Sequence, residues 1–214
     1  MSWLPVYNAW GVMLFILSVF LWKLEGLLLF LFIAGFSILF LVKESIVIVK
    51  HFASGFWMFI LSEVMAFGTL FFMCLCSEEG DVSSLSDFFE LPFLGCFILI
   101  GSSITASAYH HYLGSWQSRV FLLLTIFLGC CFILLQVFEF YDCECDLTYC
   151  VYQACCLCTV GLHFSHVVGG VVALSWLYFL GEGAVSQSNI NFVVWYWHFV
   201  DYIWLLVFLI IYVS

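Results

Sequence analysis

Charged residues are scarce in this chain, and basic residues are the scarcest. Only 8% of the 214 residues are charged, while 66% are hydrophobic and the mean hydropathy is +1.20. Soluble chains are about half apolar, so this composition excludes all but an extremely apolar soluble bundle and predicts an all-α membrane protein. The 4 Lys and Arg stand against 14 Asp and Glu, and the net charge of −10 excludes the basic surface that nucleic-acid binding requires.

Proline is also rare, with 2 residues, whereas Phe occurs 26 times, Cys 11 times and Trp 9 times. The common residues can be written with G- and T-rich codons, which favours a compact organellar genome; a bacterial origin is the alternative. Residues 1–7 carry no basic region. We therefore interpret the apolar run that follows as a first span rather than a cleavable leader.

Long apolar runs fill most of the sequence, and a lipid-spanning helix needs about 20 such residues. Polar breaks divide the chain into seven predicted spans, at residues 8–22, 27–41, 52–75, 91–113, 120–140, 149–180 and 191–213. The first two are short and predict a helical hairpin with its turn at Gly26. We expect one polytopic membrane domain over residues 1–214, with helices 1 and 2 within about 8–50 and helices 3–7 within about 52–213.

The few basic residues are distributed unevenly over the predicted loops. Lys43, Lys50 and Arg119 fall on one side of the membrane, and the opposite side has Lys23 together with most of the acidic residues. The positive-inside rule then predicts that the N-terminus lies inside and the C-terminus outside.

Several ionisable side chains fall near the middle of predicted spans, namely Glu63, His163, His166, His198 and Asp201. Because isolated charges are costly at this depth, we expect these groups to be buried against other helices. A buried carboxyl at Glu63 has two interpretations, a proton-exchanging acid and a structural group hydrogen-bonded to a neighbour. We expect it to pair with His166 or His163.

Further ionisable groups lie nearer the ends of their spans. Glu139 falls near the outer end of the fifth span and is included among the predicted buried structural residues. His110 and His111 fall at the inner end of the fourth, where the interface can solvate them.

The HxxH pair and the cysteines raise the possibility of a metal site. His163 and His166 could ligate haem, copper or zinc, but they supply only two ligands. The nearby Gly161, Gly169 and Gly170 favour close helix packing instead. The CxC and CCxC patterns do not match the paired spacing of zinc sites, which leaves a loop disulfide or buried thiols acting as small apolar groups. We predict no catalytic residue and no metal site in this chain.

The last span carries the most specific pattern. WYWHFVD at 195–201, followed by Trp204 and Leu205, resembles the last-helix signature of cytochrome c oxidase subunit III. Other motifs resemble the same family in the same order: KES at 43–45, SEV at 62–64, LP at 91–92, SIT at 103–105, HH at 110–111, LLQ at 134–136 with Glu139 and Tyr141, and GLHFSHV at 161–167. The loops after residue 45 and over 77–90 are shorter than the family's.

This resemblance implies seven transmembrane helices, arranged as a two-helix hairpin and a five-helix bundle separated by a lipid-holding cleft. It implies a non-catalytic core subunit of cytochrome c oxidase, the respiratory complex IV, which moves electrons from cytochrome c to oxygen and pumps protons. The chain would support assembly of the catalytic subunit and proton uptake. Haem and copper would be held by partner subunits I and II, beside accessory subunits. The expected location is the mitochondrial inner membrane with the N-terminus in the matrix, or alternatively a bacterial plasma membrane.

Four residues near the end of the second span are predicted to bind phospholipid: Lys43, Glu44, Lys50 and His51. Basic groups at headgroup level each contribute about 1 kcal/mol toward anionic lipid. Glu44 could accept a hydrogen bond from an amine headgroup.

The alternative function is an ion or proton transporter with a relay of Glu63, His166 and Asp201. Transporters commonly have paired interrupted helices or an inverted repeat, and the sequence has neither pattern.

Overall fold

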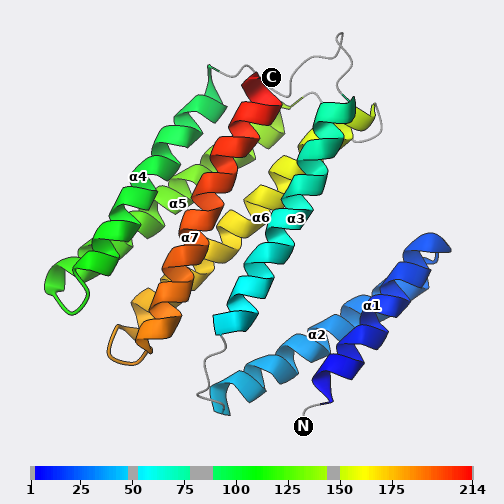
Figure 1. Cartoon of the computed structure of the whole chain (residues 1–214), viewed down its shortest axis with the longest axis horizontal. Helices are drawn as coiled ribbons and strands as arrows, with labels where there is room; N and C mark the ends of the chain where they lie inside the picture. Colours follow the sequence, from blue (N-terminus) through cyan, green and yellow to red (C-terminus); the bar gives the residue numbers. More distant parts are fainter. Residues whose placement is uncertain (1–2, 48–52, 78–88, 144–149, 214) are drawn as a thin grey trace. The chain divides into compact units, whose positions relative to one another are not determined.

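The computed structural model describes residues 3–47, 53–77, 89–143 and 150–213, without the side chains of Val42 and residues 44–47. Within these ranges the chain forms seven α-helices and one π-helical segment (Figure 1). Six of the described helices are long and apolar enough to cross a membrane, and the first is shorter, with 17 residues. The prediction of an all-α, multi-pass membrane fold is confirmed. The chain divides into two compact units, Met1–His51 and Phe52–Ser214.

The first unit is a hairpin of α1 (Leu4–Phe20) and α2 (Leu24–Val47). The α1 helix ends with Trp22 in the left-handed region, at φ 52°. The Lys23 N–H donates to the Ser18 carbonyl at 2.9 Å and the Trp22 N–H donates to the Val19 carbonyl at 3.2 Å. These two bonds form a Schellman ending, which satisfies carbonyls that the helix leaves unpaired.

The predicted turn at Gly26 is wrong, because the chain reverses at residues 21–23 and Gly26 belongs to the first turn of α2. A Cβ at Gly26 would overlap the side chain of Ser18. The glycine therefore permits close approach of the two helices rather than a turn. Farther along, the Ser37 hydroxyl donates to Asn8 Oδ1 at 2.5 Å, and Phe15 packs against Phe30 with ring centroids 4.8 Å apart.

The second unit is a bundle of α3 (Ala53–Ser77), α4 (Leu91–His111), α5 (Trp116–Asp142), α6 (Val151–Leu180) and α7 (Gln187–Val207). The π-helix η1 (Phe208–Val213) continues α7. Within this unit the helices run side by side, with α4 against α5 and α7, and with α6 against α3, α5 and α7 (Figure 1).

Some helices of the bundle begin earlier than their predicted spans. Arg119 was predicted in a loop, yet it lies in the first turn of α5, which begins at Trp116. Likewise α7 begins at Gln187 rather than at residue 191. Polar residues at a helix end can be solvated at the interface, so hydropathy underestimates the length of the helix.

Two tryptophans of α7 form the centre of the bundle, and both are fully buried. A Cβ at Gly170 would lie 2.7 Å from the Trp197 ring, and one at Gly129 would lie 2.9 Å from the same ring. A Cβ at Gly95 would lie 3.3 Å from Trp204. Glycines on α4, α5 and α6 thus provide the space for the indoles of α7.

The glycines near the HxxH pair differ in their roles. The predicted close packing is found at Gly170, whereas a Cβ at Gly161 would meet nothing within 4 Å. At Gly169 the nearest atom is the Tyr196 hydroxyl, 3.8 Å away, which is ordinary contact. The prediction for Gly161 was wrong because this residue faces away from the neighbouring helices.

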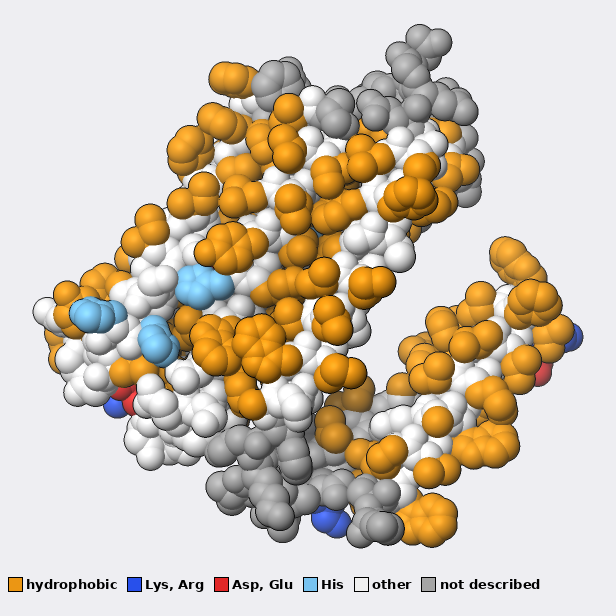
Figure 2. All heavy atoms as spheres, viewed as in Figure 1, with side chains coloured by type: hydrophobic (Ala, Val, Ile, Leu, Met, Phe, Trp, Pro, Cys, Tyr) orange, Lys and Arg blue, Asp and Glu red, His pale blue; other side chains and the backbone are white. Residues whose placement is uncertain are grey.

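Hydrophobic side chains are spread over the visible face of the described residues, and charged side chains reach it at few points (Figure 2). Large apolar residues such as Phe72, Leu123 and Val172 remain exposed on the bundle. A surface of this kind is compatible with lipid rather than with water.

Candidate functional site: polar clusters in the helix bundle

The first cluster joins α3 and α6. Glu63 Oε2 lies 2.9 Å from His166 Nε2, so the pairing expected from the sequence is present. The opposite ring nitrogen of His166, Nδ1, lies 2.8 Å from the Leu162 carbonyl oxygen. The Tyr196 hydroxyl donates to the His166 carbonyl at 3.2 Å, and the Phe67 ring lies beside the imidazole.

The geometry of His166 determines how many protons the pair holds. A carbonyl oxygen only accepts, so Nδ1 must carry a hydrogen. One further proton must then lie between Nε2 and the Glu63 carboxyl to form their hydrogen bond. The pair is either glutamic acid with neutral imidazole or glutamate with imidazolium, and its net charge is zero in both cases.

The Glu63–His166 pair was predicted to be buried, but within this chain it is only partly so. The Glu63 side chain is 20% exposed and that of His166 is 12% exposed. The residues that follow Glu63 on α3, Val64 and Met65, are themselves exposed, so the pair lies at the edge of the bundle rather than in its core.

His163 does not join this pair, although it is three residues away. It is fully buried, and its Nε2 donates to the Val200 carbonyl at 3.2 Å. Its ring packs against those of Trp204 and Phe132, at centroid distances of 5.0 and 5.7 Å, and these two rings also contact each other at 4.8 Å. Among the described residues, Nδ1 has no hydrogen-bond partner. The two histidines therefore act separately, one facing α3 and the other facing α7.

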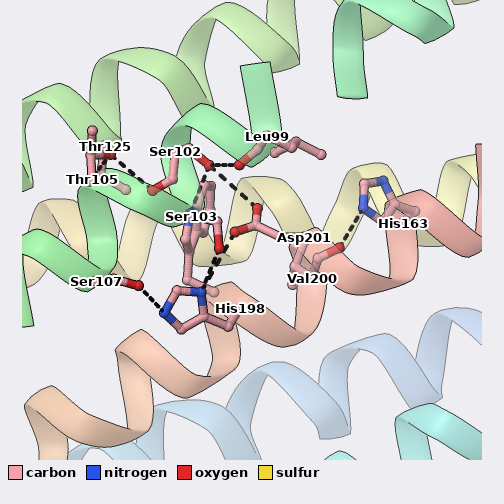
Figure 3. Close-up of polar contacts among 11 residues, drawn as sticks. Leu99, Ser102, Ser103, Thr105, Ser107, Thr125, His163, His198, Val200 and Asp201 are labelled. Atoms are coloured by element: carbon pink, nitrogen blue, oxygen red, sulfur yellow. Dashed lines mark hydrogen bonds and ion pairs between the residues drawn. The ribbon is translucent and has the colours of Figure 1, made fainter. Parts of the chain in front are cut away.

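The second cluster is the α4–α7 seam, formed by Ser102, Ser103, Ser107, His198 and Asp201 (Figure 3). The Ser103 hydroxyl lies 2.8 Å from His198 Nδ1, and the Ser107 hydroxyl lies 3.3 Å from Nε2. Asp201 Oδ2 is 4.0 Å from His198 Nδ1, which places the predicted ionisable residues of α7 next to each other.

Asp201 is buried, and Ser102 is one of its polar neighbours. The Ser102 hydroxyl lies 3.4 Å from Asp201 Oδ1 and 2.8 Å from the Leu99 carbonyl, and it accepts a hydrogen bond from Trp197 Nε1 at 3.1 Å. These contacts fix the rotation of α7 against α4.

The third cluster lies near the C-terminal end of α5. Glu139 is 3% exposed, and it accepts hydrogen bonds from Gln136 Nε2 at 2.7 Å and from the Tyr212 hydroxyl at 2.5 Å. Tyr212 belongs to the π-helix, whose wider turn changes the direction of its side chains. Glu139 is thus a buried carboxyl that accepts two hydrogen bonds.

Sequence reasoning missed Glu182. It lies in the turn between α6 and α7, after Gly181 with φ 75°. Its carboxylate accepts from the Gly114 N–H at 2.7 Å and from the Ser118 hydroxyl, and so links two turns of the bundle. An acidic residue between two glycines was the available signal. Ser102 and Ser107 of the seam were missed too, and Ser103 was noted only as part of a family motif.

The predicted lipid-binding residues are only partly described. Lys43 is exposed in α2. The Glu44 side chain, Lys50 and His51 lie outside the described residues.

The described cysteines are free thiols, with the sulfurs of Cys74 and Cys156 3.9 Å apart. Within the described ranges, no three His, Cys, Asp or Glu side chains are placed to hold a metal ion.

The family profile described as cytochrome c oxidase subunit III matches residues 37–214. The chain belongs to the cytochrome c oxidase subunit III family. The match begins within α2 and includes the whole bundle, so the family resemblance of the sequence motifs is confirmed. As a member of the subunit III family, the chain is a multi-pass membrane subunit of cytochrome c oxidase that associates with other oxidase subunits.

Relatives of subunit III come from bacteria and from animals. A probable cytochrome c oxidase subunit 3 of Rickettsia prowazekii is 31% identical over 186 residues, which cover 74% of this chain and 67% of that relative. Cytochrome c oxidase subunit 3 of Loxodonta africana is 31% identical over 176 residues. That match covers 74% of this chain and 67% of the relative. Cytochrome c oxidase subunit 3 of Rhipicephalus sanguineus is 33% identical over 179 residues. That match covers 74% of this chain and 68% of the relative.

Proposed function

We propose that this chain is a non-catalytic core subunit of cytochrome c oxidase that stabilises the catalytic subunit, binds phospholipid and supports proton uptake. Haem and copper are held by the partner subunits. The proposed location is the mitochondrial inner membrane, with the N-terminus on the matrix side. A bacterial plasma membrane is the alternative.

The observation that carries this proposal is the Glu63–His166 pair. The pair has no net charge in either arrangement of its proton, so it can exist within the membrane at moderate cost. One proton lies between two groups that can each hold it, at the edge of the bundle. A pair of this kind can store and release a proton without requiring a redox group in this chain.

The transporter alternative has less support. Asp201 lies in the α4–α7 seam, whereas Glu63 and His166 lie between α3 and α6. Among the described residues, no hydrogen bond links these two clusters, so a relay through all three would lack a path. The described α3, α4, α5 and α6 are also continuous, without the interruptions that form transporter sites.

Substituting Glu63→Gln in the intact oxidase tests the proposed role. The amide keeps the size and a hydrogen bond to His166 but cannot exchange a proton. We expect this chain to co-migrate with haem absorbance and the initial rate of electron transfer to persist, while assembly yield or endurance of turnover falls. Ser62→Ala is the matched control, because the Ser62 hydroxyl donates to the Phe59 carbonyl of its own helix. Loss of electron transfer in a fully assembled Glu63→Gln enzyme would make Glu63 catalytic and overturn the proposal.

Phospholipid binding rests on the basic residues near the end of α2. Lys43 is exposed, and its ammonium group can attract an anionic headgroup. The variant with both Lys43→Ala and Lys50→Ala should carry less phospholipid per haem after purification. Lys23→Ala removes a basic residue from the opposite predicted side and should leave that ratio unchanged. Equal lipid content in all three proteins would contradict the proposed site.

A further inference from the structure

Two thiols face each other across the interface between α3 and α6. The Cys156 thiol donates to the Cys74 sulfur, and the two sulfurs are 3.9 Å apart. Cys74 is 1% exposed and Cys156 is fully buried. The two helices pack side by side (Figure 1), although the two cysteines are 82 residues apart in the sequence. A covalent bond between these sulfurs would therefore join two helices that are distant along the chain.

The surroundings of the thiol pair favour a disulfide over a metal ion. Thr159 uses its hydroxyl hydrogen within α6, by donating to the Cys155 carbonyl at 2.7 Å. Its oxygen lies 3.9 Å from the Cys74 sulfur, so the Cys74 thiol is the donor in that contact. Metal binding requires thiolates and so brings charge into an apolar interior. Within the described ranges no third ligand joins the pair, whereas a disulfide carries no charge and needs none.

The thiol pair lies near one end of both helices. Cys74 is three residues before the end of α3 at Ser77, and Cys156 is five residues after the start of α6 at Val151. These separations correspond to about 5 and 8 Å of helix. In the proposed orientation this is the outer end, which in a bacterial membrane faces the periplasm, where disulfides persist. A small uncharged oxidant therefore has a short path to the sulfurs.

The thiol pair joins the same two helices as the Glu63–His166 pair. Cys74 follows Glu63 by 11 residues on α3, and Cys156 precedes His166 by 10 residues on α6. The two connections are therefore roughly 16 Å apart along one interface. A disulfide at the thiol pair would hold α3 on α6 without involving the groups that share the proton.

We propose that Cys74 and Cys156 are a redox-sensitive pair that a hydroperoxide converts to a disulfide. In the first step one sulfur attacks the peroxide, the O–O bond breaks, and a sulfenic acid and water form. In the second step the other sulfur attacks the sulfenic sulfur, the S–O bond breaks, and the S–S bond forms with release of a second water. The two thiols lose two hydrogens and two electrons, which reduce one peroxide.

The contact between the sulfurs decides the product of oxidation. A sulfenic acid condenses with a thiol to a disulfide, and further oxidation leads to sulfinic acid. The partner sulfur is already in contact, so condensation is favoured. Because a disulfide bond is about 2.05 Å long, the sulfurs must approach each other by about 1.9 Å as the side chains turn.

The experiment exposes the intact oxidase in neutral detergent to hydrogen peroxide, which is raised until Met73, 44% exposed beside Cys74, is oxidised. The protein is then denatured, its remaining thiols are blocked with N-ethylmaleimide, and its peptides are analysed by mass spectrometry. We expect the peptides of Cys74 and Cys156 to be joined with loss of two hydrogens, and to separate in dithiothreitol. Cys96, buried on α4, is the control and should carry the maleimide.

Two results would overturn the proposal. One is recovery of Cys74 and Cys156 as maleimide adducts or sulfinic acids once Met73 is oxidised. The other is a disulfide that joins either residue to a different cysteine. Neither result depends on the proposed function, because the same chemistry is read from the chain itself.

A second measurement tests the effect on the bundle. The oxidised oxidase should unfold at a higher concentration of denaturing detergent than the reduced oxidase, as followed by tryptophan fluorescence. Cys156→Ala should abolish this shift in the midpoint, whereas Cys96→Ala should retain it. A shift that persists in Cys156→Ala, or no shift in the unsubstituted protein, would refute the role of the pair in holding α3 on α6.

Discussion

The hairpin and the bundle bury very different shares of their apolar helices within this chain. In the membrane-spanning window of α2, 6% of residues are buried, against 44% in the window that covers α7 and η1. The mid-span ionisable residues predicted from the sequence all lie in the bundle. The hairpin thus buries few of its side chains within this chain, whereas the bundle positions chemical groups against each other.

The comparison also indicates what holds membrane helices together. Lipid is as apolar as leucine, so hydrophobicity alone does not select a neighbour, and small residues and polar contacts do. In the hairpin these are Gly26 against Ser18 and the Asn8–Ser37 hydrogen bond. In the bundle they are the glycines that contact the buried indoles, together with the three polar clusters.

The largest expected effect comes from filling the space beneath Trp197. Gly170→Ala would place a methyl group 2.7 Å from a fully buried ring and should destabilise the bundle by about 1–3 kcal/mol. Gly161→Ala, on the same helix, meets open space and should change stability little. The check is unfolding of the purified oxidase in a denaturing detergent, followed by tryptophan fluorescence. Equal stability of the two variants would mean that the glycine at 170 is not required for packing.

An intermediate effect is expected for the Glu63–His166 pair. A double-mutant cycle with Glu63→Ala and His166→Ala, each of which removes the hydrogen bond, should give a coupling free energy of about 1 kcal/mol, a typical value for an interhelical hydrogen bond in a membrane. The same cycle between Glu63→Ala and Ser62→Ala should show no coupling, since Ser62 bonds its own backbone. Coupling near zero in the first cycle would indicate that the pair does not hold α3 to α6.

The smallest effect is expected in the hairpin. Asn8→Ala removes the acceptor of the Ser37 hydroxyl and should cost about 0.6 kcal/mol of helix association. Ser37→Ala should cost a similar amount, and the double variant no more than either one. Separation of α1 and α2 can be followed by energy transfer between labels at the ends of the helices in the full chain. A loss in the double variant equal to the sum of the single losses would show that these residues act independently.

Several features could be predicted from the sequence because they depend on local properties. Apolar run length predicted the helices, and residue count placed Glu63, His166 and His198 in one depth zone. The turn of the hairpin could not be found from composition, because Trp22 adopts the left-handed conformation that normally favours glycine, while Gly26 is required for packing. In that case tertiary contact overrides the usual meaning of a glycine.

The sequence by itself determined the class of the protein, its family and which ionisable residues lie near the middle of their helices, because apolar run length, motif order and helical rise are properties of the chain alone. Only the tertiary structure decided which of those residues meet. His163 and His166 are about 60° apart around α6, since each residue turns an α-helix by about 100°. That difference is enough for His166 to reach Glu63 on α3 and for His163 to donate to Val200 on α7. The rotation and neighbours of a helix are set by packing of glycines and indoles far apart in the sequence, and depth along the membrane carries no information about them.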